Sequence, residues 1–254
     1  MFRRWWFIDL LPGLAQERPA RAGRVPRERQ ELVLREWEVL RERLAAFAAE
    51  RVATAGEVFR AAELDLPPGE GAARRDYLWA LDAYQAAGKL LDEAADLPDL
   101  TAAVVLAERA VERLAAAHAA HAGRRPDPPV LRCFYNPLHG AVPEAAPKRS
   151  NRARRRPRLG AREAAADHRP ACVACRRAII AGQRPDVLPA LLPAGATGRR
   201  SPGVLVPYYT VPQQWSPWSA TACGAYGEEG PALVMRGEHR RRVPRGRRTP
   251  PRPS

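Results

Sequence analysis

Two short segments hold three of the four cysteines, and their spacing is the strongest chemical signal in the sequence. Cys-Phe-Tyr-Asn-Pro-Leu-His-Gly begins at Cys133 and contains His139, and roughly thirty residues later Ala-Cys-Val-Ala-Cys contains Cys172 and Cys175. Tetrahedral zinc sites take four thiolate or imidazole ligands, often as two close pairs from separate segments. These four residues therefore predict a structural zinc site. The Cys-x5-His spacing is wider than the usual two to four residues, so Pro137 and its neighbours must shape a longer turn.

Other interpretations of the same residues stay open. Cys133 and Cys172 could be small buried residues of a compact β segment in which His139 fixes a turn. A Cys-x2-Cys pair at the start of a helix, here Cys172 and Cys175, can also be oxidised reversibly, which would indicate a redox site.

Further side chains could also bind a metal. If His139 points away from the site, His168 and Cys223 are the substitute ligands. His118 and His121 lie on one face at the end of a predicted helix and could form a pair. Their position is explained more simply by the favourable interaction of an imidazolium with a helix C-terminus.

Common catalytic motifs are missing from the sequence. It contains no Gly-x-Ser-x-Gly, no phosphate-binding glycine-rich loop, no His-Glu-x-x-His and no Glu-x-x-His pair. A catalytic zinc also needs an open coordination position and a nearby base. The sequence assigns no such base, and His139 could serve only if it were not a ligand. A non-enzymatic protein is favoured, and a zinc hydrolase or thiol redox enzyme is the least favoured alternative.

Residues 29–123 predict three amphipathic helices. The first has an apolar seam with alternating steps of four and three residues, at Val33, Trp37, Leu40, Leu44 and Phe47. The second, over about 72–95, has an apolar stripe at Tyr77, Leu81, Tyr84, Gly88 and Leu91. The third starts at an Asp-Leu-Pro-Asp turn and ends near residue 121. Helices with short connections that must each cover such a stripe pack as an antiparallel bundle or coiled-coil hairpin.

The remaining chain is divided by composition. We expect a flexible lead-in over 1–28, a proline-rich linker over 124–130, and a small irregular α+β, zinc-ribbon-like module over 131–230 with a basic loop at 141–166. A disordered basic tail is expected over 231–254. The fold class is therefore mainly α. Aromatic residues of the module could form its core or a binding surface that stacks on a sugar or base, and these are Tyr208, Tyr209, Trp215 and Trp218.

Charge is distributed unevenly along the chain. Residues 1–126 carry 19 Lys and Arg against 20 Asp and Glu, whereas residues 127–254 carry 23 against 8, and the net charge is +14. Such a cationic half can bind nucleic acid, anionic lipid or an acidic protein. The candidate nucleic-acid contacts lie in an arginine-rich run, at Arg152, Arg154, Arg155 and Arg156, although a solvated loop explains this run as well.

The start of the chain could contact a membrane surface through Trp5, Trp6 and Phe7. The sequence has no apolar stretch of about 20 residues that would cross a bilayer. Asp9 and Pro12 interrupt the short apolar run near the start, so a signal peptide is not expected. Free thiols or metal ligands are then favoured over disulfides, and the expected location is cytoplasmic, with peripheral membrane contact as an option.

The chain resembles a group of uncharacterised actinobacterial proteins over roughly residues 70–227. In these proteins a helical region precedes Cys-Phe-Phe-(Asn/Asp)-Pro-x-His-Gly, a cysteine-containing segment and a Pro-Tyr-Trp stretch. The counterparts here begin at Cys133, Ala171 and Val206, the last followed by Trp215-Ser-Pro-Trp. The relatives often have an N-terminal membrane helix that is missing here, and often have Asp at the position of Cys175. The resemblance implies no known activity.

Together these observations predict a scaffold or interaction protein with a structural zinc module and a protein partner. A nucleic-acid-binding protein that uses its basic second half is the main alternative.

Overall fold

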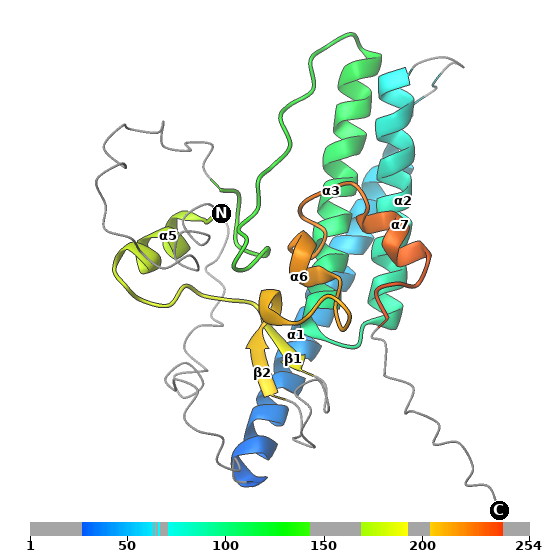
Figure 1. Ribbon diagram of the computed structural model, residues 1–254. Coiled ribbons are helices and arrows are strands. Elements are labelled where there is room, and N and C mark those ends of the chain that lie inside the picture. The colour runs from blue at the N-terminus through cyan, green and yellow to red at the C-terminus, as the bar shows by residue number, and fades with distance from the viewer. Residues whose placement is uncertain are drawn as a thin grey trace, which may run out of the picture.

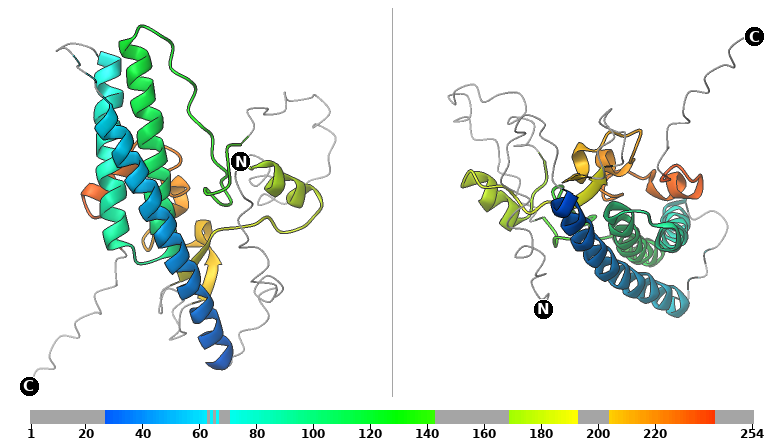
Figure 2. Two further views of the ribbon diagram at one scale, coloured as in Figure 1. Left: turned by 180° about the vertical axis from the view of Figure 1, so that it is seen from behind. Right: turned by 90° about the horizontal axis from the view of Figure 1, so that it is seen from below.

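The computed structural model describes residues 27–62, 64, 66, 71–142, 169–192 and 204–240. Three long helices, α1 (Arg27–Ala61), α2 (Gly71–Glu93) and α3 (Leu97–His121), form a bundle in which α2 runs antiparallel to the other two (Figures 1 and 2). The remaining elements are short: α5 (Val173–Ile180), the antiparallel strands β1 (Pro189–Leu192) and β2 (Val204–Pro207), the 3-10 helix η2 (Tyr208–Thr210), α6 (Trp218–Thr221) and α7 (Gly230–Met235). The predicted mainly α fold with a small β component is confirmed.

Helix α3 is the centre of the molecule. Every residue from 96 to 107 is buried, so the first turns of the helix are covered on all sides. A helix that is apolar around its whole circumference lies inside a core, whereas a coiled-coil helix buries a narrow seam. The coiled-coil alternative is therefore not supported, and α3 is the inner helix between α1 and α2 on one side and the second half of the chain on the other.

Helix α2 packs through alanines instead of the predicted larger residues. The predicted stripe from Tyr77 to Leu91 is only half-buried, and the buried face consists of Ala73, Ala80, Ala83, Ala86, Ala87 and Leu90. Alanine side chains allow two helices to approach closely, and the larger side chains then cover the edges of the contact. Along the seam predicted for α1, Leu40 and Leu44 are buried, while Trp37 and Phe47 are half-buried.

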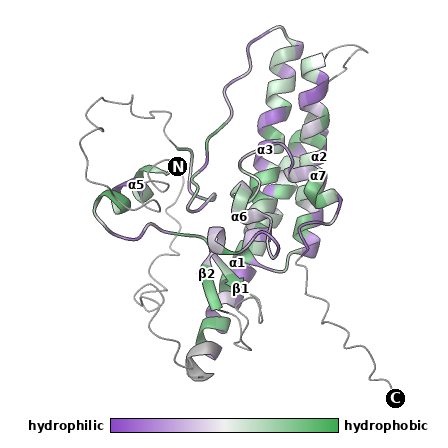
Figure 3. Cartoon of the chain, in the orientation of Figure 1, coloured by the Kyte–Doolittle hydropathy of each residue, from purple (hydrophilic) through white to green (hydrophobic). Residues whose placement is uncertain are grey.

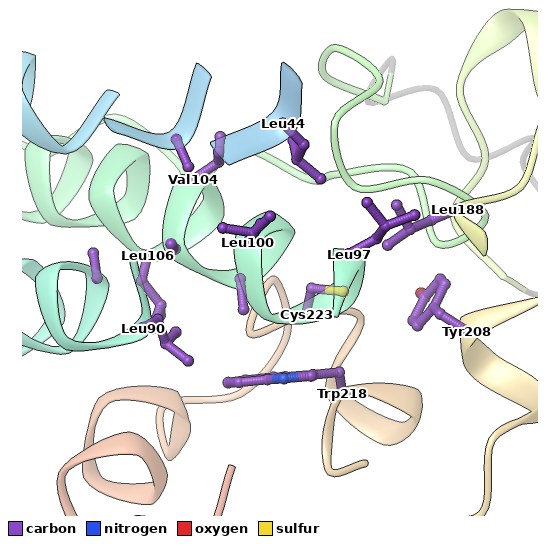
Figure 4. Close-up of a cluster of buried hydrophobic side chains, with 14 of the residues drawn as sticks. Leu44, Leu90, Leu97, Leu100, Val104, Leu106, Leu188, Tyr208, Trp218 and Cys223 are labelled. Atoms are coloured by element: carbon purple, nitrogen blue, oxygen red, sulfur yellow. The ribbon is translucent and has the colours of Figure 1, made fainter. Parts of the chain in front are cut away.

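The second half of the chain shares its core with the bundle. Leu44 of α1, Leu90 of α2 and Leu100 of α3 belong to one buried cluster with Tyr208 and Trp218 from the second half (Figure 4). The separation predicted at 124–130 is therefore incomplete, because residues 188–192 and 204–234 pack on the helices. A smaller, separate cluster surrounds the cysteines, and its buried members are Cys133, Tyr135, Val142, Ala171 and Cys175.

Part of the predicted disordered tail is ordered. Helix α7 lies within it and packs along α2, with Val234 buried. After α7 the His239 side chain is buried, and its Nε2 lies 2.9 Å from a carboxylate oxygen of Glu93 on α2. Residues 231–240 are thus part of the fold, and the rest of the predicted tail lies outside the described residues.

The N-terminus of α3 is held by a buried carboxylate at Asp99. One oxygen accepts hydrogen bonds from the backbone N–H groups of Ala95 and Asp96, both at 3.0 Å, and so satisfies donors before the first turn. The other oxygen accepts a 2.7 Å bond from the indole N–H of Trp218 on α6. A single side chain thus caps α3 and attaches α6 to it.

Asp96, also buried, makes a second set of contacts at the same end of α3. Its carboxylate accepts a 2.9 Å bond from the indole N–H of Trp37 on α1 and a 2.8 Å bond from the backbone N–H of Leu191 on β1. The Asp-Leu-Pro-Asp segment, predicted as a helix start, therefore also joins α1, the sheet and α6.

Candidate metal centre

The four predicted ligands come together in space. The ligand atoms of Cys133, His139, Cys172 and Cys175 all lie within 4.8 Å of one another. Cys133 and Cys175 are buried, and Cys172 and His139 are half-buried. A cluster of three thiols and one imidazole at this spacing is compatible with a metal site.

His139 presents its Nδ1 atom to the cysteines. This nitrogen lies 3.4 Å from the Sγ of Cys172 and 3.4 Å from the Sγ of Cys175. Zinc–nitrogen and zinc–sulfur bonds of about 2.0 and 2.3 Å place tetrahedral N and S ligands roughly 3.5 Å apart. The observed separations therefore match ligands that share one ion.

The wide Cys-x5-His spacing is closed by a turn at Asn136. Its side-chain oxygen accepts a 3.1 Å hydrogen bond from the backbone N–H of Leu138, and its carbonyl accepts a 3.0 Å bond from the N–H of His139. Pro137 is buried within the turn. Asn136 thus caps two backbone donors, and the turn brings the imidazole back to Cys133.

The second pair of ligands lies at the start of α5. Cys172 is the N-cap residue, and its Sγ accepts a 3.4 Å hydrogen bond from the backbone N–H of Cys175. The N-terminus of a helix stabilises negative charge, which favours the thiolate form of a cysteine. Helix α5 thus directs both sulfur atoms toward His139 and favours the thiolate form of Cys172.

Asp186 completes the surroundings of the imidazole and was missed in the sequence. One of its carboxylate oxygens lies 2.9 Å from Nε2 of His139, on the ring edge opposite the cysteines. A carboxylate on the outer nitrogen of a ligating histidine fixes the tautomer and the ring orientation. This contact leaves Nδ1 of His139 as the nitrogen that faces the sulfur atoms.

Replacing Asp186 with Asn is expected to weaken metal binding without abolishing it. The substitution removes a charged partner of His139 but leaves all four ligand atoms, so the expected loss is about 10- to 100-fold in affinity. Competition with a chromophoric chelator measures this change. Asp127→Asn, at an exposed linker residue, is the matched control, and equal affinities for the two variants would contradict the assigned role of Asp186.

The ionisable groups of the cluster are unequally shifted. Burial opposes charge on His139, but hydrogen bonds to Asp186 and to cysteine sulfurs outweigh burial and raise the pKa of His139 to about 11. Hydrogen bonds with Cys133 and Cys175 lower the pKa of Cys172, whereas the adjacent Cys133 and Cys172 raise the pKa of Cys175. The cluster thus readily holds one thiolate, and further negative charge in the same space requires a cation.

The two ligand segments are also joined through their backbones. The N–H of Phe134 donates a 2.8 Å hydrogen bond to the carbonyl of Pro170, and the N–H of Leu188 donates a 3.0 Å bond to the carbonyl of Tyr135. The first bond lies next to Cys133 and two residues before Cys172. The second bond lies immediately before β1. The Cys/His cluster is therefore continuous with the sheet.

Arg132, next to the first ligand, attaches the centre to α3. Its guanidinium forms ion pairs with Glu108 and Glu112, which are four residues apart on one face of that helix. The hydroxyl of Tyr226 donates a hydrogen bond to the Arg132 carbonyl. Burial raises the pKa of Glu112, while Arg132 acts in the opposite direction and favours its charged form.

Most of the aromatic residues singled out in the second half lie in the core. Tyr208, Trp215 and Trp218 are buried, and Tyr209 is half-buried. The Tyr208 hydroxyl donates a hydrogen bond to the carbonyl of Phe134. Of the two predicted alternatives, burial favours the core for Tyr208, Trp215 and Trp218, which belong to the cluster shared with the bundle.

The other candidate residues lie away from the cluster or outside the described part of the chain. Cys223 is buried in the bundle core beside Trp218 (Figure 4). His118 is half-buried and His121 exposed in the last turn of α3. Among the described residues, none of these three belongs to a group that could hold a metal. The candidates outside the described residues are His168, Arg152, Arg154, Arg155, Arg156, Trp5, Trp6 and Phe7.

In the part of the chain that the structure describes, every helix is too short or too polar to cross a membrane. No protein-family model, curated protein or solved structure matches the chain in sequence or fold comparisons.

Proposed function

We propose that the protein is a non-enzymatic scaffold or interaction protein in which one structural Zn²⁺ joins two segments of the chain. The ligands are Cys133, His139, Cys172 and Cys175. The observation that carries the proposal is their approach within 4.8 Å of one another. Thiolate and imidazole ligands in a tetrahedral set favour zinc, whereas carboxylate-rich sites favour harder ions.

A structural role is favoured over a catalytic one. Four protein ligands fill a tetrahedral site and leave no position for a water or a substrate, as a catalytic zinc requires. The carboxylate nearest the cluster, Asp186, lies on the outer nitrogen of His139 and is engaged there. Zinc would hold residues 131–142 against residues 170–188, which have a small apolar cluster of their own.

Metal analysis of the full chain tests this proposal. Protein purified without chelator is expected to contain about one zinc per chain, and the four cysteines that the structure shows unbridged are expected to react with a thiol reagent in two groups. Cys223 is buried in the bundle core and should react only on unfolding, while the three ligand thiols should become reactive when a chelator removes zinc. Protein with four free thiols and a negligible zinc content would overturn the proposal.

Nucleic-acid binding is the alternative function, and the charge distribution is the observation that favours it. Residues 127–254 carry 23 Lys and Arg against 8 Asp and Glu. Binding through phosphate contacts weakens steeply with added salt because counterions are released. Titration of RNA and duplex DNA at two salt concentrations tests this alternative, and affinity that does not change with salt would count against it.

We further propose a cytoplasmic location, supported by the unbridged cysteines, because zinc-thiolate sites persist where thiols remain reduced.

A further inference from the structure

Helix α5 exposes an apolar and basic face. Ile180 is 80% exposed, the highest value among the large apolar residues of the described chain, and Val173 is 46% exposed. Arg176 and Arg177 lie between them and are exposed. Residues at steps of three, four and seven share one face of a helix, so these four side chains form a single surface, which we call the α5 face.

The opposite side of α5 explains why this face points outward. Cys175 is buried, Ile179 is half-buried, and both belong to or pack on the cluster around the metal centre. The helix therefore uses its inner side for the ligand and the small core, and its outer side is left to solvent.

Positive charge predominates among the described residues around the α5 face. Residues 169–192 contain four arginines and one acidic residue, Asp186, whose carboxylate is engaged by His139. In the described part of the chain, neither Arg176 nor Arg177 forms an ion pair. Within the described residues, the face thus combines positive charge with exposed aliphatic side chains.

Helix α5 also protrudes from the molecule. It stands apart from the bundle, on the opposite side of the molecule from α2 and α7 (Figures 1 and 2), and apolar and hydrophilic segments alternate along it (Figure 3). A protruding helix face can contact a flat partner surface, whereas a partner segment that inserts into a groove needs a concave site.

We propose that the α5 face binds the surface of an anionic lipid bilayer. Ile180 and Val173 would enter the boundary between headgroups and acyl chains, and Arg176 and Arg177 would bind lipid phosphates. Basic residues with adjacent apolar residues bind membranes in this way, through apolar burial combined with attraction to anionic lipid.

Nucleic acid fits the α5 face less well. Phosphates would satisfy the two arginines, but Ile180 would stay in water. The face also lacks the aromatic side chains on which single-stranded bases usually stack. A bilayer accommodates both kinds of side chain.

This inference rests on the proposed zinc site, because zinc fixes Cys172 and Cys175 and thereby the orientation of α5. Zinc content is therefore measured on every sample used for binding. A zinc-loaded chain that fails to bind vesicles contradicts the inference alone, and a zinc-free chain contradicts the proposed function.

The test is co-sedimentation of the full chain with vesicles of phosphatidylcholine alone or mixed equally with phosphatidylglycerol. We expect binding to the anionic vesicles and weak binding to the neutral ones. Each arginine near an anionic surface contributes roughly fivefold in affinity, so Arg176→Glu with Arg177→Glu should reduce binding by at least about 25-fold. Ile180→Asp should reduce it by about tenfold or more, because apolar burial is lost.

Helix α2 supplies matched controls. It carries an exposed arginine pair, Arg74 and Arg75, and an exposed aliphatic residue, Leu78. Arg74→Glu with Arg75→Glu, and Leu78→Asp, make the same chemical changes far from α5 and should alter binding by less than about threefold.

Several outcomes would overturn the inference. They are absence of binding to anionic vesicles, equal binding by the α5 variants and the α2 controls, and RNA binding that depends on Arg176 and Arg177 but not on Ile180. The milder variants Arg176→Gln with Arg177→Gln, and Ile180→Ser, are used if a charge reversal lowers the zinc content.

Discussion

Replacing Cys133 with Ser is expected to remove almost all zinc from the protein and to unfold residues 131–142 and 169–188, while α2 and α3 stay folded. Cys133 is fully buried and belongs to the small cluster that also contains Tyr135 and Cys175. A structural zinc contributes most of the folding free energy of the small segment that it holds. Without it, the apolar cluster around Cys133 is too small to stay ordered alone.

Hydrogen exchange measures this result segment by segment. The amide of Phe134, bonded to Pro170, and the amide of Arg176, bonded to Cys172, are expected to exchange at least about 100-fold faster in the variant. Amides in the middle of α3 should change little, because that helix is covered by α1, α2 and the second half of the chain.

Cys223→Ala is the control for this substitution. Cys223 is also fully buried but lies in the bundle core, away from the other cysteines. The variant is expected to keep one zinc per chain even if the bundle loses some stability. Retention of zinc by Cys133→Ser, or its loss from Cys223→Ala, would contradict the assignment of ligands.

The four residues of the Cys/His cluster could be predicted from the sequence, whereas the residue that supports His139 could not. Cysteine and histidine at short spacings are a local signal, because the spacing within each pair can be read from the sequence whatever the tertiary fold. Asp186 has no such signal, because it lies in an irregular segment after α5 with no fixed spacing to His139. Its role depends on a turn that brings the segment against the imidazole, and that turn follows from tertiary packing.

The helices were predicted for a similar reason, and their packing was not. Apolar periodicity places three helices, but it does not say which face of an alanine-rich helix is buried. In α2 the tyrosines and leucines give the stronger pattern, and yet the alanines are inside because they permit close approach to α3. The return of α6 and α7 to the bundle was missed because Trp218 lies in a segment rich in Pro, Ser and Gly, where no period reveals a buried face.

Replacing Asp99 with Ala is expected to lower the free energy of unfolding by about 3–5 kcal/mol. The substitution leaves three donors without a partner, namely the backbone N–H groups of Ala95 and Asp96 and the indole N–H of Trp218. Each buried donor that loses its acceptor costs about 1–3 kcal/mol, and the loss of a helix cap typically costs about 1 kcal/mol. Chemical denaturation followed by tryptophan fluorescence measures the change.

Two further variants separate the effect of Asp99 from a general loss of negative charge. Asp92→Ala, at an exposed position near the end of α2, should change stability by less than about 0.5 kcal/mol. Asp99→Asn keeps one acceptor oxygen, so it can serve either the backbone donors or Trp218, and an intermediate loss is expected. Zinc content should stay at one per chain in all three variants, because Asp99 lies in the bundle core and the ligands lie in a separate cluster. A loss below about 1 kcal/mol for Asp99→Ala would show that water or a rearranged turn replaces the carboxylate, and that α6 is held on α3 by apolar packing of Trp218 alone.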